Sequence, residues 1–280
     1  MLFHIRTRVF VAVALIILML GMSASFGISS QDERKSTSLE DEIPLLLTHS
    51  TITDIGFSAD SIYTNTTIAA GTYNGCAILE NQSMVCWGDN EYGQLGDGTT
   101  TGSAVPIYVN VAANETPVEV TVGQVTACAL MESGNIYCWG SGYYGKMGNG
   151  EPWNDDYVNT EMRQVLLPEG QGGQTVSISG GHICTILNNG DVYCWGRGNQ
   201  GQLGYGGTSN RNIPAKVNLP GQRSAIAIST GTFMTCAITN DGMGYCWGEN
   251  DEGQLGNGTT NSRQMTPAEV LFPSGNTPVS

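Results

Sequence analysis

Basic side chains are scarce in this sequence of 280 residues. Only 11 Lys and Arg stand against 25 Asp and Glu, which gives a formal net charge of −14 at pH 7. A negative charge repels the phosphate backbone, and proteins that bind nucleic acid instead gather basic residues in a patch. We therefore expect no nucleic acid among the partners of this chain.

Histidines and catalytic motifs are scarce as well. The chain has 3 His, and it contains no nucleophile elbow, no paired-histidine metal motif and no phosphate-binding loop. Charged residues make up 13% of the chain, whereas 40% is hydrophobic and 38 residues are Gly. That composition is typical of a globular β protein with many tight turns. We expect no catalytic residue, no cofactor and no metal site, and keep a secreted enzyme as a second class of function.

Repetition is what the sequence has in abundance. One frame consists of a Cys, a short loop, Cys-Trp-Gly and then Gly-Gln-Leu-Gly or a close variant. It occurs at Cys76–Gly96, Cys128–Gly148, Cys184–Gly204 and Cys236–Gly256, with the tryptophans 52, 56 and 52 residues apart. A fixed period near 50 residues predicts a propeller or a repeat array.

Each frame is typical of a β-hairpin. In the third copy, Cys184–Leu187 and Asp191–Trp195 flank the loop Asn188-Asn189-Gly190. Three-residue hairpin loops favour Gly at the last position, because that residue needs a positive φ. The first copy has Glu80-Asn81-Gln82 there, so this is the turn that we expect to differ.

The same register sets the two cysteines of each hairpin opposite one another. They fall on a non-hydrogen-bonded pair, where Cα atoms approach to about 4.5 Å, within reach of a disulfide. Zinc sites use cysteines roughly two to four residues apart, and free core thiols are the other alternative. We predict four disulfides, Cys76–Cys86, Cys128–Cys138, Cys184–Cys194 and Cys236–Cys246.

Other positions of the frame also have structural interpretations. The Trp after each second Cys points to the opposite face of its strand, and its recurrence predicts a stacking contact between successive units. Gly-Gln-Leu-Gly, or Gly145–Gly148 with Lys and Met in the second copy, predicts tight turns around a buried apolar residue. His182 stands where the other copies have Asn74, Thr126 and Met234, which favours a structural role over a catalytic one.

The repeat unit has the content of a propeller blade. It begins with a strand such as Val176–Gly180 and ends in an extended, Pro-containing segment such as Ile213-Pro214. With the hairpin this gives three to four short strands, as a blade requires. We predict an all-β β-propeller of about four units of roughly 50 residues in an incomplete ring. The units are 68–117, 118–174, 175–223 and 224–280.

The first 28 residues are of a different kind. Arg6 and Arg8 precede the apolar run Val9–Leu20, which ends in small residues. This pattern predicts a secretory signal, with a retained N-terminal membrane anchor as the alternative. Paired cysteines independently favour an oxidising compartment. We expect a secreted or cell-surface protein that meets a membrane only through this segment.

Both flanks of the repeats carry expectations. We interpret residues 29–67 as a linker, in which Ile43–Tyr63 is either a degenerate first strand or a ring-closing segment. Val270–Ser280 runs parallel to Val165–Ser177, so the sequence stops where a fifth unit would continue. We favour a fragment of a longer protein, and expect a complete four-unit chain to close alone or to pair as a homodimer.

The repeat resembles a known family over Ile68–Ser280. Strand-Gly-x-x-x-Cys-Ala, Gly-x-x-Tyr-Cys-Trp-Gly and Gly-Gln-Leu-Gly-x-Gly are similar to the regulator of chromosome condensation repeat, in the Cys-containing form of secreted or surface microbial proteins. The resemblance implies a β-propeller, typically of seven blades, that binds partners. It also offers guanine-nucleotide exchange on the GTPase Ran, disfavoured by the net charge of −14 and the secretory start. Enzyme inhibition, as in a secreted β-lactamase inhibitor, is a further alternative.

Function is best sought where the copies differ, since packing explains the shared positions. The clearest departure is Glu151–Tyr157, in the copy with the longer spacing. Exposed Trp and Tyr anchor many interfaces, so we name Trp153, Tyr157, Tyr143 and Tyr144 as candidate partner-binding residues. For Trp153 the alternative is packing beneath its own loop. We expect an extracytoplasmic binding module that contacts a protein or a glycan through its loops.

Acidic and amide side chains gather in two loops, Asp89–Asp97 and Glu249–Asn257. Their spacing does not match that of an EF-hand loop. We expect solvated turns there, with a weak calcium site as the alternative.

Overall fold

The computed structural model describes residues 67–152, 157–260, 262–274, 276 and 278. The chain divides into two compact units, Met1–Ile62 and Tyr63–Ser280, and all described residues belong to the second. The predicted signal or anchor and nearly all of the predicted linker therefore lie outside the described residues. In the part that is described, no helix is long and apolar enough to cross a membrane.

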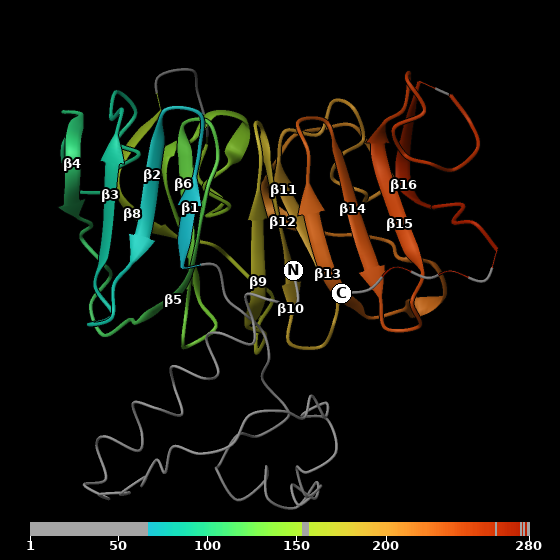
Figure 1. Cartoon of the computed structure of the whole chain (residues 1–280), viewed down its shortest axis with the longest axis horizontal. Coiled ribbons are helices and arrows are strands. Elements are labelled where there is room, and N and C mark those ends of the chain that lie inside the picture. Colours follow the sequence, from blue (N-terminus) through green and yellow to red (C-terminus); the bar gives the residue numbers. More distant parts are fainter. Residues whose placement is uncertain (1–66, 153–156, 261, 275, 277, 279–280) are drawn as a thin grey trace, which may run out of the picture. The chain divides into compact units, whose positions relative to one another are not determined.

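The described chain forms four antiparallel sheets, each of four strands in sequence order (Figure 1). We call them blades 1 to 4. Blade 1 consists of β1 (Ile68–Ala70), β2 (Asn74–Ile78), β3 (Met84–Gly88) and β4 (Ser103–Tyr108). Blade 2 consists of β5 (Pro117–Val122), β6 (Thr126–Met131), β7 (Ile136–Ser141) and β8 (Val158–Gln164), with the short 3-10 turn η1 (Tyr143–Gly145) before β8.

Blades 3 and 4 repeat this order. Blade 3 consists of β9 (Gly173–Ile178), β10 (His182–Leu187), β11 (Val192–Gly196) and β12 (Arg211–Lys216). After the 3-10 turn η2 (Pro220–Gln222), blade 4 consists of β13 (Ala225–Thr230), β14 (Met234–Thr239), β15 (Gly244–Glu249) and β16 (Arg263–Glu269). The predicted all-β propeller class is confirmed, and the four described blades do not close into a ring.

Each central hairpin has the predicted register. In blade 3, Cys184 pairs with Cys194 and Thr185 pairs with Tyr193. The equivalent cysteines pair in the other three hairpins. All four disulfides form, each with a Cα–Cα distance of 4.1 Å, and they leave no free cysteine in the described chain. Every disulfide therefore lies within one blade.

The expectation of a different turn in the first hairpin is wrong. Gln82 takes a φ of 64°, close to the 80° of its counterpart Gly190. Its backbone N–H donates to Leu79 O at 2.9 Å, as that of Gly190 donates to Leu187 O at 2.8 Å. The register of the strands thus imposes the same turn even where a side chain makes it unfavourable.

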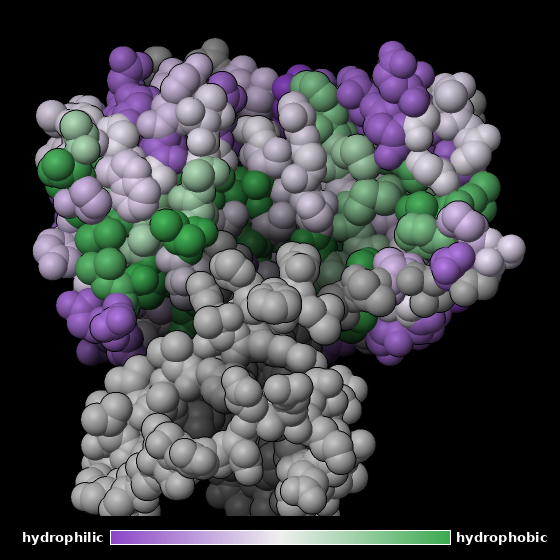
Figure 2. Space-filling model, in the orientation of Figure 1, coloured by the Kyte–Doolittle hydropathy of each residue, from purple (hydrophilic) through white to green (hydrophobic). Residues whose placement is uncertain are grey.

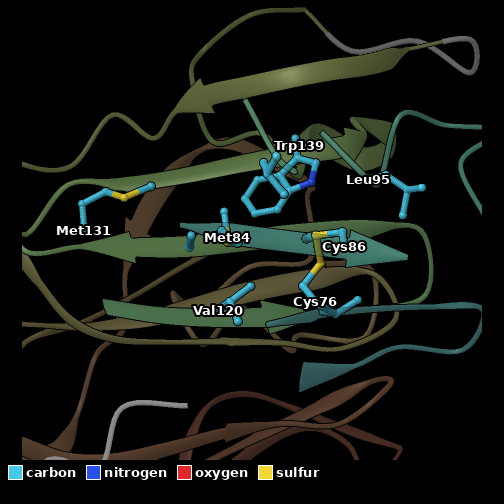
Figure 3. Close-up of a cluster of buried hydrophobic side chains, with 11 residues drawn as sticks. Cys76, Met84, Cys86, Leu95, Val120, Met131 and Trp139 are labelled. Carbon is cyan, nitrogen blue, oxygen red and sulfur yellow. A yellow bond between two sulfur atoms is a disulfide. The ribbon is translucent and has the colours of Figure 1, made fainter. Parts of the chain in front are cut away.

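The blades join through the tryptophans of Cys-Trp-Gly, as predicted. Trp139, Trp195 and Trp247 are fully buried. In the first junction, Trp139 lies among Leu95, Met84 and the Cys76–Cys86 disulfide of blade 1 (Figure 3). The indole N–H of each tryptophan also donates to a backbone carbonyl of the preceding blade: Gln94, Lys146 and Gln202, at 2.9, 2.8 and 2.9 Å.

The two end blades differ from the internal junctions. Trp87 of blade 1 is only half-buried, whereas its three counterparts are completely covered. A shallow apolar groove of about 330 Å³ lies on blade 4, lined by residues that include Tyr245 and Phe272. Apolar side chains accordingly gather on the surface over both end blades (Figure 2). Exposed examples are Ile68, Val105 and Tyr108 in blade 1, and Met265, Leu271 and Phe272 at blade 4.

Candidate functional site

A cavity of about 600 Å³ opens where the loops of the blades meet, and we call it the loop cavity. Blade 1 contributes one loop residue to it, and blade 4 contributes the β13–β14 turn. Blade 2 contributes the β5–β6 turn and the segment around η1. Blade 3 contributes the β9–β10 turn and the residue after β11. Its lining residues are Tyr92, Gln124, Val125, Ser141, Tyr143, Tyr144, Lys146, Gly180, Gly181, Arg197, Thr232 and Phe233.

Lys146 is the most buried ionisable group of this lining. The residue is 3% exposed, and its aliphatic stem runs over Gly196 of blade 3, where a Cβ would lie 3.4 Å from Lys146 Cγ. Among the described residues no acceptor or carboxylate meets its ammonium group. Because burial disfavours the charged form, the pKa of Lys146 is lowered to about 8.

The change from Gln to Lys also alters the loop before it. In the other blades the Oε1 of this Gln accepts the backbone N–H of the residue two positions earlier, and we call this contact the staple. Gln94 Oε1 accepts from Tyr92 N–H at 2.9 Å, and Gln202 Oε1 accepts from Gln200 N–H at 2.8 Å. An ammonium group has no acceptor, so Lys146 cannot hold the loop in this way.

Tyr144 takes a backbone conformation that its counterparts in the other blades do not take. It stands two residues before Lys146 and adopts a φ of 66°, whereas none of its counterparts Tyr92, Gln200 and Glu252 has a positive φ. Left-handed backbone is uncommon for an aromatic residue and costs roughly 1 kcal/mol. The second blade therefore has a loop of its own shape, and that loop forms a wall of the loop cavity.

Arg197 provides the second positive charge. Its guanidinium carbon lies 5.1 Å from the ring centroid of Tyr144 and 4.8 Å from that of Phe233, within the range of cation–π contacts. Its Nε donates to Asn199 Oδ1 at 2.8 Å. Two rings and one amide thus hold the guanidinium in place at the cavity wall.

Charge is distributed unevenly between this cavity and the rest of the chain. Lys146 and Arg197 are the charged residues of its lining, and no Asp or Glu is among them. The whole chain, in contrast, has 25 acidic and 11 basic residues. The loop cavity is therefore a positively charged hollow in an acidic protein.

The structure places the predicted partner-binding residues unequally. Tyr143 and Tyr144 line the loop cavity, with ring centroids 3.9 Å apart and an interplanar angle of 52°. Tyr157 lies against Gly142 and the core cluster shared by blades 2 and 3. Its hydroxyl donates to Glu151, which raises the pKa of Tyr157. Trp153 lies outside the described residues, and the roles of all four remain predictions.

The two loops considered for calcium use their amides internally. Asn90 and Asn250 are fully buried, and each Oδ1 accepts the N–H of the buried leucine that follows, at 2.9 and 3.1 Å. The Asn90 amide nitrogen donates to Thr101 O at 3.0 Å. Across the described residues, no group of three or more His, Cys, Asp or Glu is placed to hold a metal ion.

His182 joins blades 3 and 4. It is fully buried, and its Nε2 lies 2.7 Å from Thr235 Oγ1. The Thr235 hydroxyl donates its own proton to Gln202 O at 3.0 Å, so it accepts from His182, whose proton is therefore on Nε2. Burial of this neutral ring lowers the pKa of His182 to about 3, as befits a structural residue.

Sequence reasoning missed Lys146, Arg197 and Phe233 as site residues. The signal for two of them was present, because Lys146 replaces the Gln of Gly-Gln-Leu-Gly. Arg197 follows Cys-Trp-Gly where the first and fourth copies have Asp89 and Glu249. Lys146 thus adds a positive charge to the repeat, and Arg197 reverses the sign of the charge at its position. Lys146 and Arg197 are 51 positions apart in the sequence, which conceals that both line one cavity.

Comparison with known proteins identifies the repeat. Two models of the regulator of chromosome condensation (RCC1) repeat match the chain: one at residues 85–130, 189–238 and 241–280, the other at 66–94, 118–146, 174–202 and 225–254. The chain is 32% identical over 199 residues to the human E3 ubiquitin-protein ligase HERC2, and 33% identical over 206 residues to the Arabidopsis thaliana ultraviolet-B receptor UVR8. These matches take in 70% and 74% of this chain but only 4% and 46% of the relatives.

Solved structures agree on the fold. Prp20p of Saccharomyces cerevisiae superposes with a TM-score of 0.65 at 18% identity, over 74% of this chain and 50% of that one. Human WBSCR16 superposes with a TM-score of 0.66 at 21% identity, over 76% and 54%. At these identities the likeness concerns the fold alone. With repeat models matched in all four blades, the chain belongs to the regulator of chromosome condensation repeat family.

Proposed function

We propose that this chain is a non-catalytic, protein-binding module whose partner docks on the loop face that carries the loop cavity. One observation carries the proposal: blade 2 departs from the common loop conformation to place Tyr143 and Tyr144 around a cavity that all four blades line. Unfavourable backbone conformations tend to persist where they serve a function.

The surface has the composition of a binding site. Aromatic side chains and Arg provide much of the energy at protein interfaces, because they bury large areas and still make polar contacts. Tyr92, Tyr144, Phe233 and Arg197 bring these residue types together at the cavity. The shared repeat positions, in contrast, are used for packing between and within the blades.

Relatives support a binding role. Yeast Prp20p binds Gsp1p and histones, and in a second structure the same yeast protein is bound to Kap60. Another protein of this fold thus binds protein partners, and its partners are not assigned to the present chain. The four disulfides favour an extracytoplasmic location, and we propose one.

The test is affinity capture with matched surface variants. The immobilised protein would be exposed to envelope and extracellular proteins of its source organism, and each captured protein would be purified and its binding measured directly. Phe233→Ala should weaken that binding by about tenfold, since it removes a cavity ring. Tyr108→Ala removes an exposed ring of β4, outside the cavity, and should leave binding unchanged. Equal effects of the two variants, or binding to glycans alone, would contradict the proposal.

A further inference from the structure

We propose that the loop cavity is an anion site that receives a carboxylate from an acidic peptide segment, with Lys146 and Arg197 as its two cationic ligands. This inference rests on the proposed function, because it assigns a chemistry to the partner of the same surface. It extends that function from a binding face to a particular kind of side chain.

The first argument is the state of Lys146. A buried ammonium group costs several kcal/mol unless a counter-charge or hydrogen bonds compensate it. Lys146 is 3% exposed, yet no carboxylate or acceptor reaches its ammonium group within the described chain. Lys146 lines the loop cavity, so an anion that enters the cavity could supply the missing counter-charge. Gln occupies this position in the other three blades, which shows that packing alone does not require a lysine.

The second argument is the state of Arg197. The Nε–H of Arg197 donates to Asn199 Oδ1. The N–H groups of its two Nη atoms have no acceptor among the described residues. The rings of Tyr144 and Phe233 contact the flat guanidinium group at 5.1 and 4.8 Å from its carbon. A guanidinium that is fixed in this way presents the planar pair of donors that matches the two oxygens of a carboxylate.

The third argument is the identity of the anion. Both cations border a hollow without any acidic residue, in a chain of net charge −14 that otherwise repels anions. Selection for an anion is therefore local to this cavity. A glutamate or aspartate side chain fits it, since the planar carboxylate pairs with Arg197 and the methylene groups contact Tyr144 and Phe233. Such side chains reach the cavity on a peptide, the kind of ligand that a protein-binding face receives.

The experiment measures the binding of a short labelled peptide that contains consecutive glutamates, by fluorescence anisotropy in low-salt buffer. The same peptide with glutamines is the neutral probe. Lys146→Met and Arg197→Met should each lower the affinity for the acidic peptide by about tenfold or more, as expected for loss of a charge-assisted contact. Met is chosen for Lys146 because, unlike Gln, it does not restore the staple of the preceding loop.

Lys216→Met is the matched control. Lys216 is exposed and pairs with Asp191 at 2.7 Å, away from the loop cavity, so its loss changes net charge by the same amount. We expect it to alter the affinity by less than about twofold. Thermal unfolding of each variant shows that the fold is retained. Equal effects of Lys146→Met and Lys216→Met, or equal affinity for the glutamate and glutamine peptides, would overturn the proposal.

Three further outcomes separate the anion site, its peptide ligand and the proposed function from one another. A uronic-acid oligosaccharide that binds through Lys146 while the acidic peptide does not bind would keep the anion site and overturn its peptide ligand. A protein partner that depends on Phe233 but not on Lys146, with no binding of the acidic peptide, would overturn the anion site alone. Acidic peptide binding without any protein partner would overturn the proposed function and keep the anion site.

Discussion

The indole N–H of Trp195 donates to the backbone carbonyl of Lys146 at 2.8 Å. The tryptophan that joins blade 3 to blade 2 therefore holds the backbone of Lys146, which lines the loop cavity. The same bond in the next junction joins Trp247 to Gln202 O at 2.9 Å, where no cavity residue is involved. One repeated contact thus has a structural role in both places and a positioning role in one.

This pair of contacts gives a first prediction. Trp195→Phe keeps most of the buried ring but removes the hydrogen bond, and it should lower the free energy of unfolding by about 1–2 kcal/mol. Trp247→Phe should cost about the same. Only Trp195→Phe should also weaken binding of the acidic peptide, since only this substitution removes the hydrogen bond to the backbone of Lys146. Urea unfolding and anisotropy check both parts, and equal loss of peptide binding in the two variants would refute the positioning role.

Lys146 should make the fold less stable than it could be. Its pKa is about 8 in the folded protein against the ordinary 10.5, so the unfolded chain binds the proton more tightly. Folding therefore carries a cost that is fully present below pH 8 and disappears as the pH rises from 8 to 10.5. Lys146→Met should raise the free energy of unfolding at pH 7 by about 1–3 kcal/mol, and by much less at pH 10. A variant that is less stable than wild type at pH 7 would contradict this account.

His182 should contribute to acid unfolding. Its pKa is about 3 in the fold against 6.5 in its absence, so the stability linked to its neutral form is complete above pH 6.5 and is lost as the pH falls toward 3. Each pH unit in this window removes about 1.4 kcal/mol. His182→Gln keeps a donor toward Thr235 and cannot titrate, so its unfolding free energy should fall less steeply between pH 6.5 and 4. Parallel pH profiles for the two proteins would show that His182 does not titrate with unfolding.

Gln82 offers a stabilising substitution. It holds a φ of 64° in a turn where the other hairpins have Gly, so Gln82→Gly removes the left-handed strain. The greater freedom of Gly in the unfolded chain offsets part of this gain, which leaves about 0.5–1 kcal/mol of added stability. Gln82→Ala keeps the strain and serves as the control, with no comparable gain in thermal unfolding. Equal stability of the two variants would mean that the turn is not strained.

The sequence predicted the blades far better than the cavity, for a physical reason. Hairpin register, the disulfides and the buried tryptophans follow from spacings within one repeat, where loop length and the alternation of side chains decide the outcome. Lys146 and Arg197 meet only because two blades pack at a particular angle, which no local pattern specifies. Tyr144 is left-handed in the described blade that carries Lys146 in place of this Gln, and the difference becomes visible only beside the three repeats in which Gln accepts a backbone N–H.

The disulfides have a mechanical consequence. Each one closes a loop with a sequence separation of 10 within a single hairpin, and none crosses from one blade to the next. Under tension between its ends, this chain could yield at the tryptophan junctions and at the outer strands of each blade, all of which are held by noncovalent contacts. The residues inside each covalent loop could not contribute to the extension. Each central hairpin would remain a covalently shortened link, and an oxidised chain would have a shorter contour length than a reduced one.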